Sequence, residues 1–442
     1  MAGDRRSGHR YGAMAAVLLG AAVLTGAGCF ESTPLPPSTD VAWTSVAAGS
    51  FHSCGLADDG AAYCWGLNGN GQLGAGPASY RGIVARPQRV HGEASFRSLT
   101  AGRFHTCGLG VGGRLYCWGE GGSGQLGLDP DSADVGCVGT LCISPLEAPG
   151  SDTLGLVQVD AGATHTCGVA EGGEAYCWGD NVWGQLGTGD SGEEAGGPDP
   201  LRVESDASFT AVSAGARHTC GLADSGEVWC WGDNGSGQVG AVTEETCGST
   251  VDSAGAEVGG FPCVPSPARV PAERTFRAIA AGGAHTCSLD DGGTAFCWGS
   301  DARSALGDGF GSPDECSASP DVPGVPCSRE PVRVATDASF ATLAAGDGHA
   351  CAATASGAAW CWGDNGLGQI GYCGVGAPYA PERVCRVDTF RTVAAGGLHS
   401  CGATESGDAW CWGANGEGQL GSGSTRFSYF GPVQVGEAAA GG

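Results

Sequence analysis

Hydrophobic and polar positions alternate along the chain in short runs that are interrupted by glycine. In residues 96–127 an aromatic and an aliphatic position lead to Ala101-Gly102. His105-Thr106-Cys107, a glycine turn, Tyr116-Cys117-Trp118-Gly119 and Gly124-Gln125-Leu126-Gly127 follow. Alternation with a period of two over runs of this length is typical of β-strands. The pattern predicts three strands joined by tight turns, and the glycine density leaves no run for a helix of useful length.

The same unit occurs seven times. Its histidine marks each copy, at His52, His105, His165, His218, His285, His349 and His399, with spacings of 50–67 residues. A fourth strand is predicted at a Pro-x-x-Val motif, at residues 87–90, 267–270, 331–334 and 432–435. Four strands per unit at this period are typical of a propeller blade. The sequence therefore predicts an all-β fold, a seven-bladed β-propeller of four-stranded antiparallel blades over residues 41–435. We expect the strand at 43–49 to pair beside 432–435 and close the ring.

Within every unit two cysteines stand ten positions apart on either side of a turn such as Asp58-Asp59-Gly60. Folding about Asp59 places Cys54 opposite Cys64, at a Cα separation of about 4.5–5.5 Å that a disulfide can bridge. We therefore expect seven staples that join Cys54 to Cys64, Cys107 to Cys117, Cys167 to Cys177, Cys220 to Cys230, Cys287 to Cys297, Cys351 to Cys361, and Cys401 to Cys411. Four further pairs lie between the repeats: Cys137 with Cys142, Cys247 with Cys263, Cys316 with Cys327, and Cys373 with Cys385. Of the 23 cysteines only Cys29 is left over.

The N-terminal 28 residues have the layout of an export signal. Three arginines precede an apolar stretch at 13–24, and small residues at 26–28 lead into Cys29. The segment resembles a bacterial lipoprotein signal, in which the cysteine after the cleavage site is lipidated; ordinary cleavage after Ala27 is the alternative. We therefore expect a lipidated Cys29, a Pro/Ser/Thr linker over 29–40 and a flexible tail over 436–442. The expected location is the cell envelope, lipid-anchored on the outer membrane or the cell surface, because Phe30 is not the Asp that favours inner-membrane retention.

The composition excludes several classes of partner and site. The net charge is -26, and every basic residue other than histidine is an arginine. A surface this acidic repels phosphate backbones and anionic lipids, which argues against nucleic acid and against membrane binding other than through a lipid anchor. The absence of lysine removes a P-loop or Schiff-base lysine, and we expect no cofactor. The expected partner is a protein or glycan at the cell surface, and the expected state is a monomer.

The repeat resembles a known family. Ala-Gly-x-x-His, the following glycine turn, the aromatic-Cys-Trp-Gly run and Gly-Gln-Leu-Gly are similar to the repeat of the regulator of chromosome condensation family, over roughly residues 41–435. The resemblance implies a seven-bladed propeller scaffold. It does not imply the nucleotide-exchange activity on chromatin of the eukaryotic founder, because this chain is acidic, has an export signal and lacks a basic tail. The same propeller is also similar to a secreted inhibitor that caps β-lactamases.

Two repeated features suggest chemistry but have simpler structural explanations. His52, Cys54 and Cys64 offer metal-ligand atoms, yet the related repeat keeps this histidine where it has no cysteine, so we predict no metal site. The repeated tryptophans have the chemistry of stacking platforms, but residues that recur in every blade usually build the blade. Trp183 and Tyr372 have no counterparts in the other copies and are better candidates for contact with a partner.

Insertions after the Gly-Gln-Leu-Gly turn occupy 128–149, 188–200, 241–267, 308–331 and 372–381. Insertions at an equivalent place in a repeat emerge on one face, which is often the binding face. We predict a binding face made of Asp131, Asp134, Trp183, Glu193, Glu194, Glu244, Glu245, Asp314, Glu315 and Tyr372. The alternative is that these loops are solvated spacers.

The predicted function is a non-enzymatic, envelope-anchored protein-binding scaffold with an acidic insertion-loop face. No catalytic residues are predicted, because the only histidines outside the repeats are His9 and His91 and no nucleophile or zinc motif stands out. Two alternatives remain open: a secreted or surface inhibitor that caps an enzyme, and a carbohydrate-active enzyme whose spare carboxylates act on glycans.

Overall fold

The computed structural model describes residues 41–77, 82–129, 137–248, 250–251, 257–258, 260–312, 314–316, 324–374 and 379–436. The chain divides into a unit of residues 1–34 and a unit of residues 35–442, and all the described residues belong to the second. The predicted signal at 1–28, Cys29, the linker to residue 40, Asp131, Asp134 and the tail after residue 436 lie outside the described residues.

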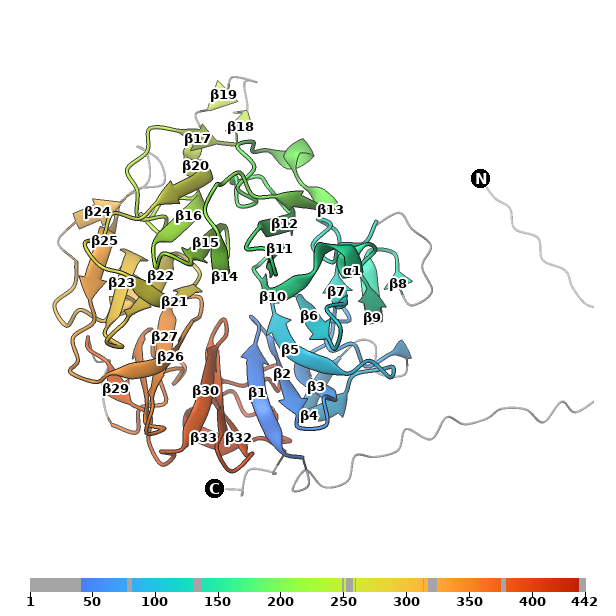
Figure 1. Cartoon of the computed structure of the whole chain (residues 1–442). Helices are drawn as coiled ribbons and strands as arrows, with labels where there is room; N and C mark the ends of the chain where they lie inside the picture. Colours follow the sequence, from blue (N-terminus) through green and yellow to red (C-terminus); the bar gives the residue numbers. More distant parts are fainter. Residues whose placement is uncertain are drawn as a thin grey trace, which may run out of the picture. The chain divides into compact units, whose positions relative to one another are not determined.

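Seven antiparallel sheets form a closed ring around a central axis (Figure 1). Blade 1 contains β1 (Trp43–Ala48), β2 (His52–Ala57), β3 (Ala62–Leu67) and β4 (Ile83–Arg89). Blade 2 contains β5 (Phe96–Ala101), β6 (His105–Gly110), β7 (Leu115–Glu120), β9 (Leu141–Glu147) and β8 (Cys137–Val138). Blade 3 contains β10 (Leu156–Ala161), β11 (His165–Ala170), β12 (Ala175–Gly179) and β13 (Gly197–Arg202). Blade 4 contains β14 (Phe209–Ala214), β15 (His218–Ala223), β16 (Val228–Asp233), β20 (Phe261–Arg269) and β17 (Thr246–Cys247).

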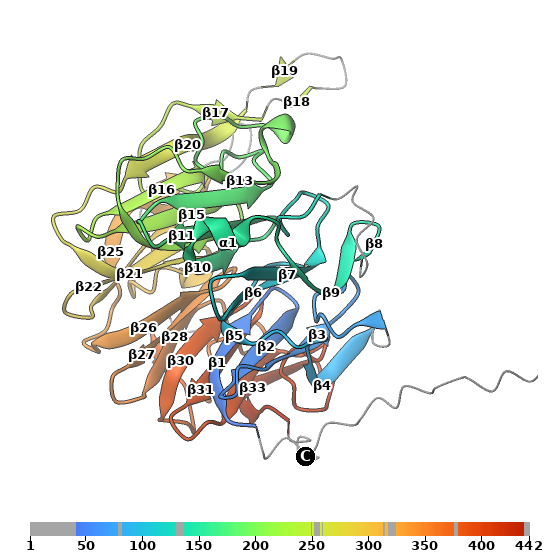
Figure 2. The same cartoon turned by 45° about the vertical axis from the view of Figure 1, so that its right-hand side comes forward.

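The remaining three blades repeat this order. Blade 5 contains β21 (Phe276–Ala281), β22 (His285–Asp290), β23 (Ala295–Ser300), β25 (Val325–Arg333) and β24 (Asp314–Cys316). Blade 6 contains β26 (Phe340–Ala345), β27 (His349–Thr354), β28 (Ala359–Gly363) and β29 (Glu382–Arg383), and blade 7 contains β30 (Phe390–Ala395), β31 (His399–Thr404), β32 (Ala409–Ala414) and β33 (Ser428–Gln434). A separate ribbon pairs β18 (Thr250–Val251) with β19 (Glu257–Val258) and extends away from the ring (Figure 2). The described helical turns are α1 (Ser151–Leu154), η3 (Glu193–Ala195) and η4 (Ala302–Ser304).

The prediction of a seven-bladed, all-β propeller is confirmed, with one refinement. Blades 2, 4 and 5 have five strands, because their insertions fold back as β8, β17 and β24 along the start of the fourth strand. The fourth strands also begin before the Pro-x-x-Val motif and end just before its valine, as in β4, where Pro87 is tolerated because this is the outer edge of the sheet.

The cysteines pair as predicted from their spacing. Cys54 lies directly opposite Cys64 in the β2–β3 hairpin, and the seven hairpin disulfides have Cα separations of 4.0–4.2 Å. The other four described disulfides join Cys137 to Cys142, Cys247 to Cys263, Cys316 to Cys327 and Cys373 to Cys385. Every blade is therefore cross-linked between its second and third strands.

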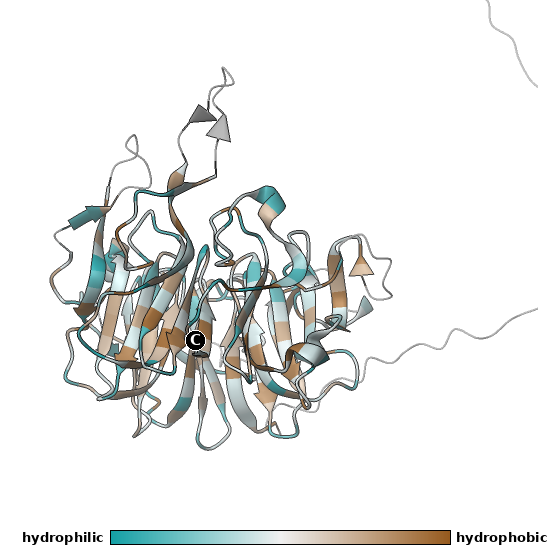
Figure 3. Cartoon of the chain, turned by 45° about the horizontal axis from the view of Figure 1, so that its top comes forward, coloured by the Kyte–Doolittle hydropathy of each residue, from teal (hydrophilic) through white to brown (hydrophobic). Residues whose placement is uncertain are grey.

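The second strand of each blade lies between two neighbouring blades. All six residues of β2, β6, β11, β15 and β31 are buried. Glycine in this strand makes room for an aromatic ring of the first strand: a Cβ added to Gly55 would lie 2.5 Å from the Trp43 ring of the same sheet. Between sheets, a Cβ added to Gly74 of blade 1 would lie 2.7 Å from Trp118 Nε1 of blade 2. The hydropathy bands of Figure 3 show these apolar layers running through the strands. The close approach explains why the repeat alternates small and bulky residues.

A hydrogen-bond network joins neighbouring blades at six of the seven seams. The imidazole Nε2 of one blade lies 2.7–3.0 Å from a Thr or Ser hydroxyl of the following blade, as between His52 and Thr106. That hydroxyl donates to the carbonyl of the Gly-Gln-Leu-Gly glutamine at 2.8–2.9 Å, and the tryptophan Nε1 donates to the same carbonyl at 2.8–3.1 Å. Since the hydroxyl hydrogen is used on the carbonyl, the imidazole must donate from Nε2. Burial lowers the pKa of these histidines and so keeps the rings neutral.

The expected pairing of residues 43–49 beside 432–435 is wrong. β1 pairs with β2 and β33 pairs with β32, so blades 1 and 7 are each built from consecutive strands. The ring closes through the same network that joins the other blades: Ser53 Oγ lies 2.7 Å from His399 Nε2, and Trp65 Nε1 donates to the Gln419 carbonyl at 2.8 Å. A strand exchanged between the chain ends is therefore not needed for closure.

The seam between blades 5 and 6 lacks this network. Ala350 stands where the other blades have Thr or Ser, and Ala305 stands where they have Gln. At this seam His285 Nε2 and Trp362 Nε1 are buried without a hydrogen-bond partner. Ser304 also takes the positive φ, 62°, that glycine adopts in the other copies. An unsatisfied buried polar group costs about 1–3 kcal/mol, so this seam is the weakest of the ring.

Restoring the missing hydroxyl tests this account of the seam. In Ala350→Thr we expect the free energy of unfolding of the oxidised protein to rise by about 1 kcal/mol, because the new hydroxyl joins His285 Nε2 to the Ala305 carbonyl. Thr219→Ala, at an intact seam, should lower it by about 1–3 kcal/mol. Denaturant titrations measure both changes, and a destabilised Ala350→Thr variant would show that this network does not hold the blades together.

The network also predicts a pH dependence. Burial lowers the pKa of His52, His105, His218, His349 and His399 to about 3, and that of His165 and His285 to about 4. The unfolded chain therefore binds protons first, and stability falls between the unfolded histidine pKa near 6.5 and pH 4, by about 1.4 kcal/mol per pH unit for each histidine.

Burial raises the pKa of Asp160, so this carboxyl makes the folded state more stable as the pH falls, opposite to the histidines. The histidine effect is therefore measured by comparing variants. Denaturant titrations from pH 7 to pH 4 should show a shallower fall in His105→Gln than in the exposed-histidine control His91→Gln. Equal slopes in the two variants would contradict the assignment of the effect to the buried ring of histidines.

Candidate binding face

The strand order gives the ring two different faces. The loop after the first strand and the connection after the third strand leave the same end of each blade, as the 3.0 Å bond from Leu67 N to the Phe51 carbonyl shows. We call this end the insertion face, because the described parts of all five insertions lie on it. The opposite end carries the tight turns between second and third strands and the links between blades, and we call it the hairpin face.

The centre of the insertion face is a narrow axial opening. It is lined by the Ala-Gly pairs of all seven blades and has a volume of about 70 Å³. Backbone bonds tie the blades together here, for example from Gly397 N to the Gly49 carbonyl at 3.2 Å. Only glycine fits, since a Cβ on Gly49 would lie 2.4 Å from the Gly102 carbonyl oxygen. The opening admits a few water molecules but not a sugar or a nucleotide.

Two charged residues lie at the mouth of this opening, Arg103 on blade 2 and Asp347 on blade 6. Burial raises the pKa of Asp347, and the positive charge of Arg103 lowers it again. The guanidinium of Arg103 also lies 5.3 Å from the centre of the Phe104 ring. A single carboxyl next to an arginine, with no second acid or base beside it, has no arrangement for acid-base chemistry.

The predicted binding residues that the structure describes lie on the insertion face but do not converge. Glu193 and Glu194 on η3, Glu244 and Glu245 before β17, and Asp314 and Glu315 on β24 are exposed on blades 3, 4 and 5. Trp183 is half-buried between two partners from blade 4: the Phe261 ring at 4.7 Å between centroids and the Arg217 guanidinium at 4.5 Å. Tyr372 packs against the core of blade 6, so much of its ring contributes to packing within the blade rather than to a binding surface.

An open crevice of about 430 Å³ lies between blades 2 and 3 on this face. Backbone of Gly122, Gly124 and Gly197 lines it, together with the carboxylates of Asp180 and Glu193. Asp180 already accepts hydrogen bonds from Thr164 Oγ1 at 3.0 Å and from Val182 N at 3.0 Å. Its carboxylate therefore serves the local turn, and the crevice holds no pair of carboxylates free for glycosidase-type work.

Sequence reasoning missed a set of apolar residues on blades 7, 1 and 2. Phe51 and Phe104 stack at 5.4 Å between ring centroids, and Leu398, Ile83 and Phe427 are exposed. We call these five residues the apolar sector. Phe51, Phe104 and Leu398 occupy the second variable position of Ala-Gly-x-x-His, where the other copies have Thr164, Arg217, Ala284 and Gly348. Comparing the copies at their variable positions, rather than at their shared ones, would have found this signal.

The histidines and cysteines of the repeat have structural partners. Six of the imidazoles bond to hydroxyls of the next blade, and the 22 cysteines of the predicted pairs are in disulfides. In the described part of the chain, no three His, Cys, Asp or Glu side chains gather as metal ligands would. Among the same residues, no helix has the length and apolar character needed to cross a membrane.

The repeat matches known proteins along most of the propeller. A model of the regulator of chromosome condensation (RCC1) repeat matches residues 43–72, 96–125, 156–185, 209–238, 276–304, 340–369 and 390–419. A second model with the same description matches 59–109, 112–169, 172–222, 225–289 and 406–440, which is more than half of the chain.

Individual proteins that resemble this chain have low sequence identity to it. Ultraviolet-B receptor UVR8 of Arabidopsis thaliana is 30% identical over 279 residues, 63% of this chain and 58% of that protein. The mitochondrial RCC1 domain-containing protein RUG3 of Arabidopsis thaliana is 28% identical over 265 residues, 59% of this chain and 55% of that protein. The chain thus spans little more than half the length of these two relatives. The structure of Prp20p from Saccharomyces cerevisiae has the same fold, with a TM-score of 0.69, 22% identity, and coverage of 86% of this chain and 87% of that one. The chain belongs to the regulator of chromosome condensation (RCC1) repeat family.

Proposed function

We propose that this propeller is a non-enzymatic protein-binding scaffold of the cell envelope that binds its partner on the insertion face. The observation that carries the proposal is the uneven distribution of exposed apolar side chains. Of the twelve large hydrophobic residues that are exposed in the described chain, nine lie at the insertion face: Ile83, Val138, Val242, Phe310, Val325, Tyr379, Leu398, Phe427 and Phe430. Exposed apolar side chains that gather on one face are typical of protein interaction sites.

Rigid support adds to this argument. Four disulfides hold the insertions of blades 2, 4, 5 and 6, and backbone bonds fix neighbouring insertions to each other, as from Gly309 N to the Tyr379 carbonyl at 3.2 Å. Loops that are already ordered lose less entropy on binding, so a given contact area gives a higher affinity. The related propeller Prp20p has binding properties toward Gsp1p and histones, which supports the use of this fold as a platform for proteins.

The chain enters and leaves the propeller on the hairpin face, opposite the proposed binding face. Residues 41–42 enter at the hairpin face, where the Ala42 carbonyl accepts from Asp58 N at 2.9 Å and Trp43 N donates to the Gly407 carbonyl at 2.8 Å. The last strand returns to the same face, since Val435 N bonds to the Ala409 carbonyl at 2.9 Å. A lipid on Cys29 would therefore be joined to the propeller through the strand that enters at its hairpin face.

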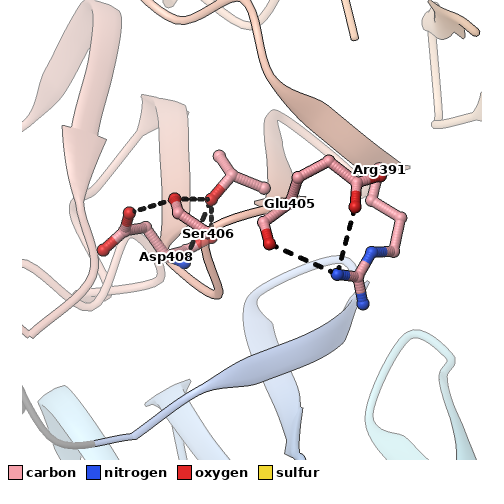
Figure 4. Close-up of polar contacts among 5 residues, drawn as sticks. Arg391, Glu405, Ser406 and Asp408 are labelled. Carbon is pink, nitrogen blue, oxygen red and sulfur yellow. Dashed lines mark hydrogen bonds and ion pairs between the residues drawn. The ribbon is translucent and has the colours of Figure 1, made fainter.

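The entry point is an ordered part of the hairpin face (Figure 4). In the turn between β31 and β32, Ser406 Oγ donates to Asp408 Oδ2 at 2.6 Å, and Arg391 forms an ion pair with Glu405 at 3.3 Å. These contacts hold the turn whose Gly407 carbonyl receives the first described strand. The anchored end of the chain is therefore attached to a rigid part of the propeller.

Removing the lipidation site tests the anchor. In Cys29→Ser we expect the protein to move from the membrane fraction to the soluble fraction, because a single serine cannot carry the acyl chains. Mass spectrometry of the mature wild-type N-terminus should show a diacyl or triacyl cysteine, and Ser32→Ala is the matched control. A wild-type chain that begins at Gly28 without lipid would establish ordinary cleavage instead.

Capture from envelope extracts tests the binding face. Purified full-length protein should retain a specific protein partner that is lost in Phe427→Asp and kept in Val111→Asp, since Phe427 is 70% exposed on the insertion face and Val111 is 73% exposed on the hairpin face. If the partner is an enzyme whose activity falls on binding, the propeller is a capping inhibitor. Hydrolysis of cell-wall or matrix glycans by the purified propeller would overturn the non-enzymatic assignment.

A further inference from the structure

The insertion face is divided into two regions of different chemistry. The three longest insertions, at 128–149, 241–267 and 308–331, belong to blades 2, 4 and 5, and the connections of blades 7 and 1 are shorter. The apolar sector lies on blades 7, 1 and 2, and the exposed carboxylates lie on blades 3, 4 and 5. We call the second region the acidic arc, and it consists of Asp190, Glu193, Glu194, Glu244, Glu245, Asp314 and Glu315.

The apolar sector spans the ring closure. The Phe427 ring lies over Gly416, and Gly418 of the same turn lies against Ile83 of blade 1. Ile83 pairs with Leu67, whose N donates to the Phe51 carbonyl, and Phe51 stacks on Phe104 of blade 2. Leu398 joins this path through the bond from Ala414 N to its carbonyl at 2.9 Å. Phe427 and Ile83 are 70% and 48% exposed, so the sector offers a ready anchoring surface.

The ion pairs are distributed unevenly between the two faces. Five of the six ion pairs found among the described residues are on the hairpin face: Arg114 with Glu147, Arg269 with Glu227, Arg333 with Asp337, Arg383 with Asp388, and Arg391 with Glu405. The insertion face has the ion pair of Arg303 with Asp364. None of the seven carboxylates of the acidic arc forms an ion pair with a described arginine. The acidic arc is thus a group of exposed carboxylates without a described arginine partner, on the face that carries most of the exposed apolar residues.

We infer that the partner presents a basic protein surface with an apolar, aromatic-sized anchor, the anchor seated on the apolar sector and Lys or Arg side chains against the acidic arc. This inference rests on the proposed function and names the partner's chemistry. Unpaired surface charge of one sign steers a partner of the opposite sign, whereas desolvated aromatic contacts supply most of the affinity. A second copy of this chain fits poorly, because two insertion faces would bring unpaired carboxylates together.

The division of roles has a kinetic consequence. Charge pairs that stay near solvent raise the association rate and are screened by salt over about 10 Å at 0.1 M ionic strength. Contacts of the apolar sector act mainly on the dissociation rate and are insensitive to salt. Variants in the two regions should therefore change different rate constants of the same complex.

A random peptide display library selected on the purified full-length protein tests the inference with a defined probe. Selected peptides should be enriched in Lys or Arg together with Trp, Tyr or Phe. For a selected peptide, Phe427→Ser should weaken binding about tenfold or more at every salt concentration, and Val111→Ser on the hairpin face should leave it unchanged. Phe427 is largely exposed, so its replacement leaves the core intact.

Charge removal provides the second arm. The variant Glu193→Gln, Glu194→Gln, Glu244→Gln, Glu245→Gln should lower the association rate severalfold at low salt and flatten its salt dependence. The control is a variant with the same loss of charge on the hairpin face, Asp58→Asn, Glu93→Gln, Glu171→Gln, Asp224→Asn, which should have a much smaller effect.

Each outcome decides between the two proposals. Peptides that bind the insertion face but are acidic, or that lack aromatic residues, would overturn the partner chemistry and leave the binding face intact. Peptides that lose binding in Val111→Ser but not in Phe427→Ser, or a library without binders to the insertion face, would count against both. Dimerisation in sedimentation experiments that is abolished by Phe427→Ser would identify a second copy as the occupant and overturn the inference.

Discussion

The structure depends on one hydrogen-bond network, which passes from a histidine of one blade to a hydroxyl of the next, and from there to the carbonyl that the tryptophan also contacts. The network satisfies polar groups that would otherwise be buried without partners between two sheets. Small residues, such as Gly74 of blade 1 against the Trp118 ring of blade 2, let the sheets come close enough for it to form. The same contacts join blade 7 to blade 1, so the ring closes by side-chain chemistry without strand exchange.

The sequence predicts what is local in the chain. The strands, the blade count and the pairing of Cys54 with Cys64 follow from alternation and from a spacing of ten residues around a turn. The partner of His52 could not be predicted, because Thr106 is 54 residues away and lies on another sheet. The apolar sector was missed for the same reason: Ile83 of blade 1 and Phe427 of blade 7 come to lie beside the same turn, residues 416–418, only after the two ends of the propeller have been brought together.

Shared positions build the ring, and variable positions distinguish its faces. The repeated tryptophans Trp65 and Trp118 are fully buried and serve the seams, as expected of residues that recur in each blade. The variable residues of Ala-Gly-x-x-His and the insertions give the insertion face its aromatic and acidic regions. Disulfides in the hairpins and insertions hold the shared and the variable residues in place, so that loops rich in glycine and carboxylates keep one conformation.

Hydrogen–deuterium exchange of the oxidised protein, followed residue by residue, tests most directly whether this network holds the blades together. The amides of β22 and β27, on either side of the seam without the network, should exchange faster than those of β6, β11, β15 and β31 at intact seams, because local opening is governed by the contacts that must break. Uniform protection of all seven second strands, or the slowest exchange at β22 and β27, would contradict the account.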